Sequence, residues 1–353
     1  MPERKIGICP QTELTCTFRK DTRACRELDF EYCKDFAVIT GSANKPLAQE
    51  IAYILDAIIP TATNMFPDGE TNVKIPESVR GKNVYIIQSG QPNPNDRIIE
   101  TALMVDAADR ASAKEITVIF SYFPYSRKDR KDESRVPISA AVMAKTLKNC
   151  GAKRILTIDL HAEQEQGFVD GPWDNLYSSY VLIPKIKEYV DNSVVVASPD
   201  AGGVPRVNFY AKMLRTTDIA VVPKIRNPQE GNVATSLGVL GNVKDRNVLL
   251  VDDIIDSAGT LVKAAVKLKT AGARSIIVAA PHALFSGKAL ENIANSPIEK
   301  ILTTNSIEQK EKVLENPLVE VVSIAPLITS AICRVQSARS LDQLIIDTNG
   351  KNH

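Results

Sequence analysis

The sequence lacks several features that mark whole classes of protein. No uninterrupted apolar run approaches the roughly 18 residues that a membrane-spanning helix requires. The opening stretch MPERKIGICPQTELTC has no apolar segment of the kind that a secretory signal contains. Lys plus Arg number 43 and Asp plus Glu 42, so the net charge is +1. Without a global basic field, the chain is not expected to be a dedicated binder of nucleic acid or anionic membranes. We expect a soluble, cytoplasmic protein.

Cysteine pairs at metal-site spacing are also missing. Four of the six cysteines fall early in the chain: Cys9, Cys16, Cys25 and Cys33. They lie too far apart for CxxC-type zinc sites. Disulfides form mainly in oxidising compartments, and no secretory signal points there. The other two, Cys150 and Cys333, fall in helix-like patterns and are simplest to interpret as core residues.

Apolar strand-like runs that alternate with amphipathic, helix-length segments fill most of the chain. Its 353 residues suggest two domains at about 100–200 residues each. Residues 1–35 show no clean periodicity, so we predict an N-terminal arm there. The strand-like runs lie at 37–40, 83–88, 116–122, 154–160, 194–198, 220–224, 248–253, 275–281, 300–305 and 319–324. Such runs, separated by amphipathic helices, indicate parallel sheets covered on both faces. The sequence therefore predicts a doubly wound α/β fold.

One pattern occurs twice, in residues 81–122 and again in residues 245–282. Each copy has a charged turn, an Asn-Val strand, a loop, a long helix and a second apolar strand. This repetition predicts two domains related by internal duplication, at 36–180 and 181–330. We expect residues 331–353 to form a C-terminal helix and tail that packs back on the N-terminal domain. The copies differ at the loop, where only the second has two adjacent acids.

The segment VLLVDDIIDSAGT (248–260) carries the strongest chemical signal. An apolar strand ends in two carboxylates, Asp252 and Asp253, and a loop then leads into a helix. The loop residues are Asp256, Ser257, Ala258, Gly259 and Thr260. Free backbone N–H groups at a helix N-terminus bind phosphate, whereas the acids suit sugar hydroxyls or a metal-chelated sugar. The segment therefore predicts a ribose-phosphate site. Simple helix capping is the alternative, but it needs one acid rather than three.

Three further motifs follow strand-like runs. His161 in DLHAEQEQGF could bind a metal or phosphate, or could be a hydrogen-bonded structural histidine. Asp200 in SPDAGGVPR could hold Mg²⁺ or cap the following helix. Lys224 and Arg226 in PKIR are two residues apart, so an extended segment would present both on one side. They could clamp a phosphate chain, or they could be a solvated surface pair.

These motifs together resemble one family, the ribose-phosphate pyrophosphokinases. The resemblance runs from about Phe36 to Leu344 and includes FPDGETNVKIPESVRG, YFPYSRKDRKDESRVPISA and TIDLHAEQEQGFVDGPWDNLY. It implies two domains of the type I phosphoribosyltransferase-like fold. It also implies Mg²⁺-dependent transfer of the β,γ-diphosphoryl group of ATP to the 1-hydroxyl of ribose 5-phosphate. The products would be 5-phosphoribosyl 1-pyrophosphate and AMP.

The resemblance also implies roles for individual residues. Catalytic roles fall to Lys224 and Arg226. ATP would contact Phe66, Asp68, Gly69, Glu70, Arg127, Lys128 and His161. Ribose 5-phosphate would contact Arg226, Asp252, Asp253, Asp256, Ser257, Ala258, Gly259 and Thr260. His161 and Asp200 would bind Mg²⁺, and Ser78 and Arg80 match a segment tied to allosteric control. His282 matches a turn beside the sugar site, without an assigned catalytic role.

The resemblance also implies an assembly. In the family, the FPDGE turn (66–70) reaches the adenine of a neighbouring subunit. We therefore expect a homo-oligomer, built from dimers or forming a hexamer. Two departures from the family stand out: Lys128, where Gln is usual, and the residues after Arg226, which lack the usual charges.

Two other functions stay open. A phosphoribosyltransferase shares the acidic loop, but it leaves the DGE, SRKDR and DLH motifs unexplained. A non-catalytic associated subunit of the same family keeps the fold and loses site residues. Here the site residues are present, and only the two departures favour that alternative.

Overall fold

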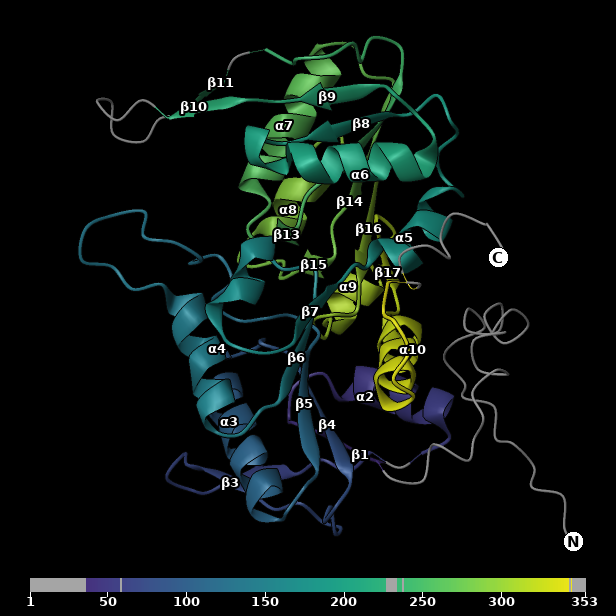
Figure 1. Ribbon diagram of the computed structural model, residues 1–353. Helices are drawn as coiled ribbons and strands as arrows, with labels where there is room; N and C mark the ends of the chain where they lie inside the picture. Colours follow the sequence, from purple (N-terminus) through teal and green to yellow (C-terminus); the bar gives the residue numbers. More distant parts are fainter. Residues whose placement is uncertain (1–35, 58, 227–233, 237, 343, 345–353) are drawn as a thin grey trace, which may run out of the picture.

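Two parallel β-sheets, one in each half of the chain, form the frame of the protein (Figure 1). The computed structural model describes residues 36–57, 59–226, 234–236, 238–342 and 344, and of 224–226 and 234–236 only the backbone. The predicted N-terminal arm and its four cysteines lie outside these residues. Within them, no helix combines the length and apolarity needed to cross a membrane.

The N-terminal sheet contains five parallel strands. In spatial order these are β1 (Phe36–Thr40), β4 (Asn83–Gln88), β5 (Glu115–Phe120), β6 (Arg154–Ile158) and β7 (Trp173–Leu176). Its two faces carry different helices: α3 (Pro94–Arg110) and α4 (Ser139–Asn149) on one, α2 (Lys45–Leu55) and α10 (Ala325–Gln336) on the other. Both faces are therefore buried, as continuous apolar strands require.

Helix α2 shows how local sequence sets an element. Pro46 occupies its first turn, where a missing N–H costs nothing, and the Asn44 side chain caps the N–H of Leu47 at 3.4 Å. Leu47 and Ile51 lie one turn apart and are fully buried. They pack against Ile328 and Ile332 of α10, so the end of the chain completes the core at its beginning.

The C-terminal sheet contains six strands, and every neighbouring pair is parallel. In spatial order these are β17 (Val319–Val322), β16 (Lys300–Thr304), β14 (Ser275–Ala279), β12 (Asn247–Val251), β8 (Val195–Ser198) and β9 (Ile219–Val221). Its faces are covered by α5 (Ser179–Ile186) and α6 (Val204–Leu214) on one side, and α7 (Gly259–Thr270) and α8 (Ala289–Ala294) on the other. The chain passes from β8 to the edge strand β9 and returns to β12 on the other side of β8. Ligands in open α/β sheets bind beside the strand ends at such a reversal.

The remaining elements are short. They are the hairpin of β2 (Thr63–Met65) and β3 (Thr71–Val73), the antiparallel pair of β10 (Lys224–Arg226) and β11 (Ala234–Ser236), the parallel pair of β13 (Ile254–Ile255) and β15 (His282–Ala283), α9 (Glu311–Leu314), and the 3₁₀ turns η4 (Glu163–Phe168) and η5 (Ala201–Gly203). The β10–β11 pair extends away from the C-terminal half in Figure 1.

The predicted α/β class with helices on both sheet faces is confirmed. Each predicted strand run overlaps a strand, and the repeated pattern corresponds to β4–α3–β5 and β12–α7–β14, each with its two strands paired in parallel. Helix α5 adds Val181 to the core of the N-terminal half and Leu182 and Ile186 to that of the C-terminal half. The predicted boundary at residue 180 falls within this shared helix, and the domain limits stay a prediction. Of the predicted core cysteines, Cys333 is buried and Cys150 half-buried.

Candidate active site

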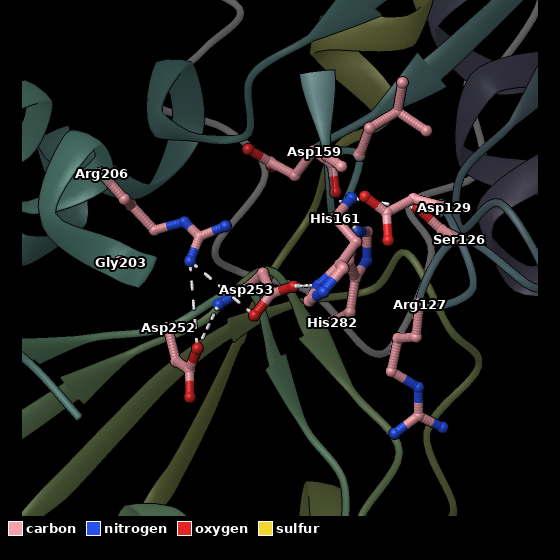
Figure 2. A network of polar contacts seen from close by, with 12 residues as sticks. Ser126, Arg127, Asp129, Asp159, His161, Gly203, Arg206, Asp252, Asp253 and His282 are labelled. Atoms are coloured by element: carbon pink, nitrogen blue, oxygen red, sulfur yellow. Dashed lines mark hydrogen bonds and ion pairs between the residues drawn. The ribbon is translucent and has the colours of Figure 1, made fainter. Parts of the chain in front are cut away.

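Strand ends from both halves of the chain border one pocket. β6 leads to Asp159 and His161, whereas β12 leads to Asp252 and Asp253 (Figure 2). The small pocket between them is lined by Tyr122, Phe123, Ser126, Arg127, Asp159, Leu160, His161, Asp253, Ile254 and His282. It therefore combines the predicted ATP-side motifs with the predicted sugar-phosphate loop.

The adjacent acids after β12 occupy different electrostatic environments. Burial raises the pKa of Asp252 well above its ordinary value, and the nearby charge of Asp253 raises it further. Burial would also raise the pKa of Asp253, but the hydrogen bond with His161 and the charge of Arg206 hold it well below its ordinary value. Arg206 Nη1 lies 3.7 Å from Asp253 Oδ1 and 3.9 Å from Asp252 Oδ1. One acid thus stays ionised while its neighbour keeps a proton readily.

His161 is oriented from the opposite half of the chain. Its Nδ1 contacts Asp253 Oδ2, and this hydrogen bond is the main reason why the pKa of His161 is raised. Its side chain is 42% exposed, so the ring borders solvent. A carboxylate on one ring nitrogen fixes the orientation of an imidazole whose other nitrogen binds a metal or phosphate.

A second contact between the halves links Arg127 to Asp256, with Nη1 2.8 Å from Oδ2. Both side chains are substantially exposed, at 50% and 36%. Exposed ion pairs contribute little stability, typically about 0–1 kcal/mol. The arginine can therefore exchange this carboxylate for a phosphate at small energetic cost.

The loop before α7 has the backbone of an anion site. Ala258 is the N-cap residue and has φ 61° and ψ 2°, in the left-handed region. Alanine offers no side-chain acceptor to the N–H groups of the first helical turn. Those N–H groups, at the positive end of the helix dipole, favour a bound phosphate.

Asp200 lies in the turn between β8 and α6. Its Oδ1 accepts a hydrogen bond from the N–H of Gly203 at 3.1 Å, so the helix-capping alternative holds for this oxygen. Within the described part of the chain, no three His, Cys, Asp or Glu side chains converge as a metal cage would. Mg²⁺ is usually held by one or two carboxylates, waters and substrate phosphates. The assignment of Asp200 and His161 to such an ion stays a prediction.

Comparisons with known proteins agree over nearly the whole described chain. A family model for the N-terminal domain of ribose phosphate pyrophosphokinase matches residues 36–151, and one for the phosphoribosyl synthetase-associated domain matches residues 223–346. The ribose-phosphate pyrophosphokinase of Campylobacter jejuni is 42% identical over 314 residues, which cover 89% of this chain and 100% of that protein. The enzyme of that name from Haemophilus ducreyi is 44% identical over 88% of this chain and 98% of its own length. The chain belongs to the ribose-phosphate pyrophosphokinase family.

A solved structure extends this assignment to the fold. The phosphoribosylpyrophosphate synthetase of Mycobacterium smegmatis superposes with a TM-score of 0.81 at 36% identity. The match covers 86% of this chain and 100% of that one. The predicted two-domain, phosphoribosyltransferase-like fold is therefore confirmed.

The structure does not bring every predicted residue of the pyrophosphokinase site together. Phe66, Asp68, Gly69 and Glu70 form the turn between β2 and β3, which Figure 1 places at the far end of the N-terminal half from β13 and β15. Within one chain they do not reach the pocket. Their contribution to a neighbouring subunit stays a prediction.

Other predicted residues lie outside the pocket or the described side chains. Lys128 pairs with Asp132 at 2.9 Å on the surface, and exposed Arg80 donates to Ser112 Oγ at 3.3 Å, close to exposed Ser78. Lys224 and Arg226 form β10, of which the backbone alone is described. Residues 227–233, where the sequence departs from the family, lie outside the described residues.

Three further residues contact the site residues but were not predicted from the sequence: Arg206, Ser126 and Glu165. Arg206 lies within a quoted motif, but its contact with the acids depends on how α6 meets β12. Ser126 accepts a hydrogen bond from the backbone N–H of His161 at 3.1 Å and donates one to Glu165 at 2.5 Å. Only the position of Ser126 beside Arg127 hinted at a role.

Proposed function

We propose that this chain transfers the β,γ-diphosphoryl group of ATP to the 1-hydroxyl of ribose 5-phosphate, which yields 5-phosphoribosyl 1-pyrophosphate and AMP. The pairing of His161 with Asp253 and of Arg127 with Asp256 carries the proposal. In each pair, one residue belongs to an ATP-side motif and the other to the sugar-phosphate loop. A phosphoribosyltransferase needs the loop alone, so these contacts favour the diphosphotransferase.

Ribose 5-phosphate would bind at the C-terminal half. Its phosphate would receive N–H groups from the loop of Ser257, Ala258, Gly259 and Thr260 at the start of α7. Its ring hydroxyls would contact Asp252 and Asp253. Because Asp252 has a raised pKa, it can donate or accept a hydrogen bond, whereas ionised Asp253 acts as an acceptor.

ATP would bind from the side of the N-terminal half. Arg127 would leave Asp256 for a phosphate, Lys128 would add a second cation, and the FPDGE turn of a neighbouring copy would contact adenine. A homo-oligomer follows from that shared site. Mg²⁺, when bound at His161 and Asp200, would neutralise the phosphate chain and orient it.

The sugar 1-hydroxyl would attack the β-phosphorus in line, and AMP would leave. The chain contributes alignment of the two substrates together with positive charge from Lys224 and Arg226. The reaction needs no covalent enzyme intermediate. Alignment of this kind is sensitive to small displacements, so the contacts between the halves are part of the catalytic apparatus.

An AMP-release assay tests the proposal. Incubation with Mg²⁺, ATP and ribose 5-phosphate should release AMP, and omission of the sugar phosphate should abolish the release. Lys224→Ala should lower turnover by roughly two to three orders of magnitude, the loss typical of a removed transition-state contact, with unfolding midpoint unchanged. Inorganic phosphate and ADP, added separately, test control through Ser78 and Arg80.

Absence of AMP release from the wild-type chain would contradict the proposal and favour the non-catalytic subunit. Transfer of the phosphoribosyl group of preformed 5-phosphoribosyl 1-pyrophosphate to a base, with release of pyrophosphate and without AMP formation from ATP, would favour the phosphoribosyltransferase. Near-normal turnover of Lys224→Ala would remove that residue from the mechanism.

A further inference from the structure

Glu165 is a fully buried carboxylate beside the pocket. It lies in η4, four residues after His161, and its exposed fraction is 0%. Carboxylates are seldom buried to this extent unless an ion pair compensates for the lost hydration. Among the described residues, Glu165 has no ion-pair partner, and its Oε2 has no hydrogen-bond donor. Among those residues, the hydrogen bonds of this side chain are all made by its other oxygen, Oε1.

Those contacts join two segments that are far apart in the sequence. Glu165 Oε1 accepts hydrogen bonds from Ser126 Oγ at 2.5 Å and from the backbone N–H of Ala162 at 3.3 Å. Ser126 Oγ in turn accepts the backbone N–H of His161 at 3.1 Å. The segment with Arg127 is thereby attached to the turn with His161.

The chemistry of the hydroxyl makes an acceptor at position 165 necessary. Ser126 has one proton to donate, and its oxygen already receives the N–H of His161. The proton must therefore go to an acceptor, and the buried Oε1 of Glu165 is the group that takes it. An apolar side chain there would leave a buried hydroxyl unpaired and would loosen the attachment between the two segments.

We propose that Glu165 is a positioning residue for the nucleotide side of the site, acting through Ser126 and the backbone of His161. It touches no substrate. The contacts continue from His161 to Asp253, so Glu165 connects the core of the N-terminal half with the acid pair of the C-terminal half. The inference rests on the proposed function, because the groups that it positions, His161 and Arg127, are assigned there to ATP.

Steady-state kinetics of Glu165→Gln, Glu165→Leu and Ser126→Ala, with ATP and ribose 5-phosphate varied separately, test the proposal. Gln retains an acceptor oxygen, so Glu165→Gln should keep the KM for ATP within about threefold of wild type. Glu165→Leu and Ser126→Ala should raise that KM about tenfold or more, the effect of one lost hydrogen bond in a buried network. The KM for ribose 5-phosphate should stay within about twofold in all three.

Glu50→Leu provides a matched control. Glu50 is also a carboxylate with restricted solvent access, and it is bonded to Asn305 at 3.2 Å and to Ser323, away from the pocket-lining residues. Its loss should lower the unfolding midpoint and leave the KM for ATP unchanged. If Glu165→Leu does not fold, Ser126→Ala and Glu165→Gln decide the question.

Equal changes in both KM values, no change in Ser126→Ala, or a defect in Glu165→Gln as large as in Glu165→Leu would each overturn the proposal.

Equilibrium binding of Mg²⁺–ATP distinguishes failure of the positioning role of Glu165 from failure of the proposed function. If the wild type binds ATP but releases no AMP, the diphosphotransferase assignment fails. The same variants then still test the positioning role by their dissociation constants for ATP.

Discussion

Asp253 lies between the guanidinium group of Arg206 and the ring of His161, so its negative charge acts on both side chains. The carboxylate is nearly buried, yet its pKa is held low because a histidine and an arginine face it. Replacement of such a buried carboxylate by an uncharged side chain of the same shape should disturb the groups paired with it.

Asp253→Asn should lower the pKa of His161, since the carboxylate that accepts its hydrogen bond and stabilises the imidazolium is removed. The chain has three histidines, so the proton resonances can be assigned by substitution and titrated by NMR. Asp129→Asn is the control, because Asp129 raises the pKa of His161 through charge alone and more weakly. An unshifted His161 in Asp253→Asn would show that the pair is absent in solution.

Glu165→Gln should change how stability depends on pH. Burial raises the pKa of Glu165 from its ordinary value of 4.5 to about 7. Between these values the folded chain holds a proton that the unfolded chain has lost, so wild-type stability falls as pH rises through this window. Gln does not titrate. The unfolding free energy of the variant relative to wild type should therefore rise by roughly 3 kcal/mol from pH 4.5 to 8.

Urea denaturation at several pH values across this window measures the effect. A difference between variant and wild type that is constant with pH would show that Glu165 titrates normally. The acids and His161 could be predicted from the sequence because each ends or follows a strand, whereas Arg127 was indicated only by the family resemblance of its motif. Glu165 could not be predicted, because its role depends on a contact with Ser126, 39 residues earlier.

The turn from β8 to α6 is closely packed. A Cβ on Gly203 would lie 2.2 Å from Ser198 Oγ, and the N–H of Gly203 holds the side chain of Asp200. The turn therefore requires glycine for close approach, at a position that has an ordinary backbone angle, φ –82°.

Gly203→Ala should lower the unfolding free energy by about 1–3 kcal/mol, because the added methyl group displaces Ser198 and the Asp200 turn. Ser198→Ala in the same chain removes the clashing oxygen and should recover part of the loss. Gly167→Ala, whose Cβ would meet nothing within 4 Å, is the control. Equal midpoints for Gly203→Ala and wild type in urea would mean that the turn has room for a methyl group at this position.

The strands show which elements a sequence can specify. Those buried on both faces, such as β4 and β12, read as continuous apolar runs and were predicted within one or two residues. β7 was missed because it is an edge strand, whose central residues Asp174 and Asn175 are only half-buried. The short pair β13–β15 was also missed, since strands of two residues carry no periodicity.

At the scale of the whole molecule, buried polar contacts join the two halves. His282 is fully buried, and burial lowers its pKa, so the ring is neutral. Its Nε2 donates to the carbonyls of Ile158 and Asp159, both 3.1 Å away, while Nδ1 lies 2.9 Å from Ser306 Oγ. The carbonyl of Ser306 accepts from Ser89 and Ser121 of the N-terminal half.

His282→Leu should weaken the coupling between the halves. The substitution leaves buried carbonyls without a donor, at a cost of about 1–3 kcal/mol. For the wild type we expect a single unfolding transition. Calorimetry of the variant should then resolve two transitions or show a broadened one. His282→Gln restores a donor and should recover part of the cooperativity. An unbroadened single transition in His282→Leu would mean that other contacts suffice to couple the halves.

Helix α10 has a consequence for the order of events during synthesis. It packs on α2 and fills the core beneath β1, yet it is translated after every strand of both sheets. Domains generally fold as they emerge from the ribosome, first part first. Here the first half must wait with an open apolar face until the chain is nearly finished, whereas the strands and helices of the C-terminal sheet are already complete. The part of the protein that is made first is therefore the last to close, and it is the part that a nascent-chain chaperone would be needed to shield.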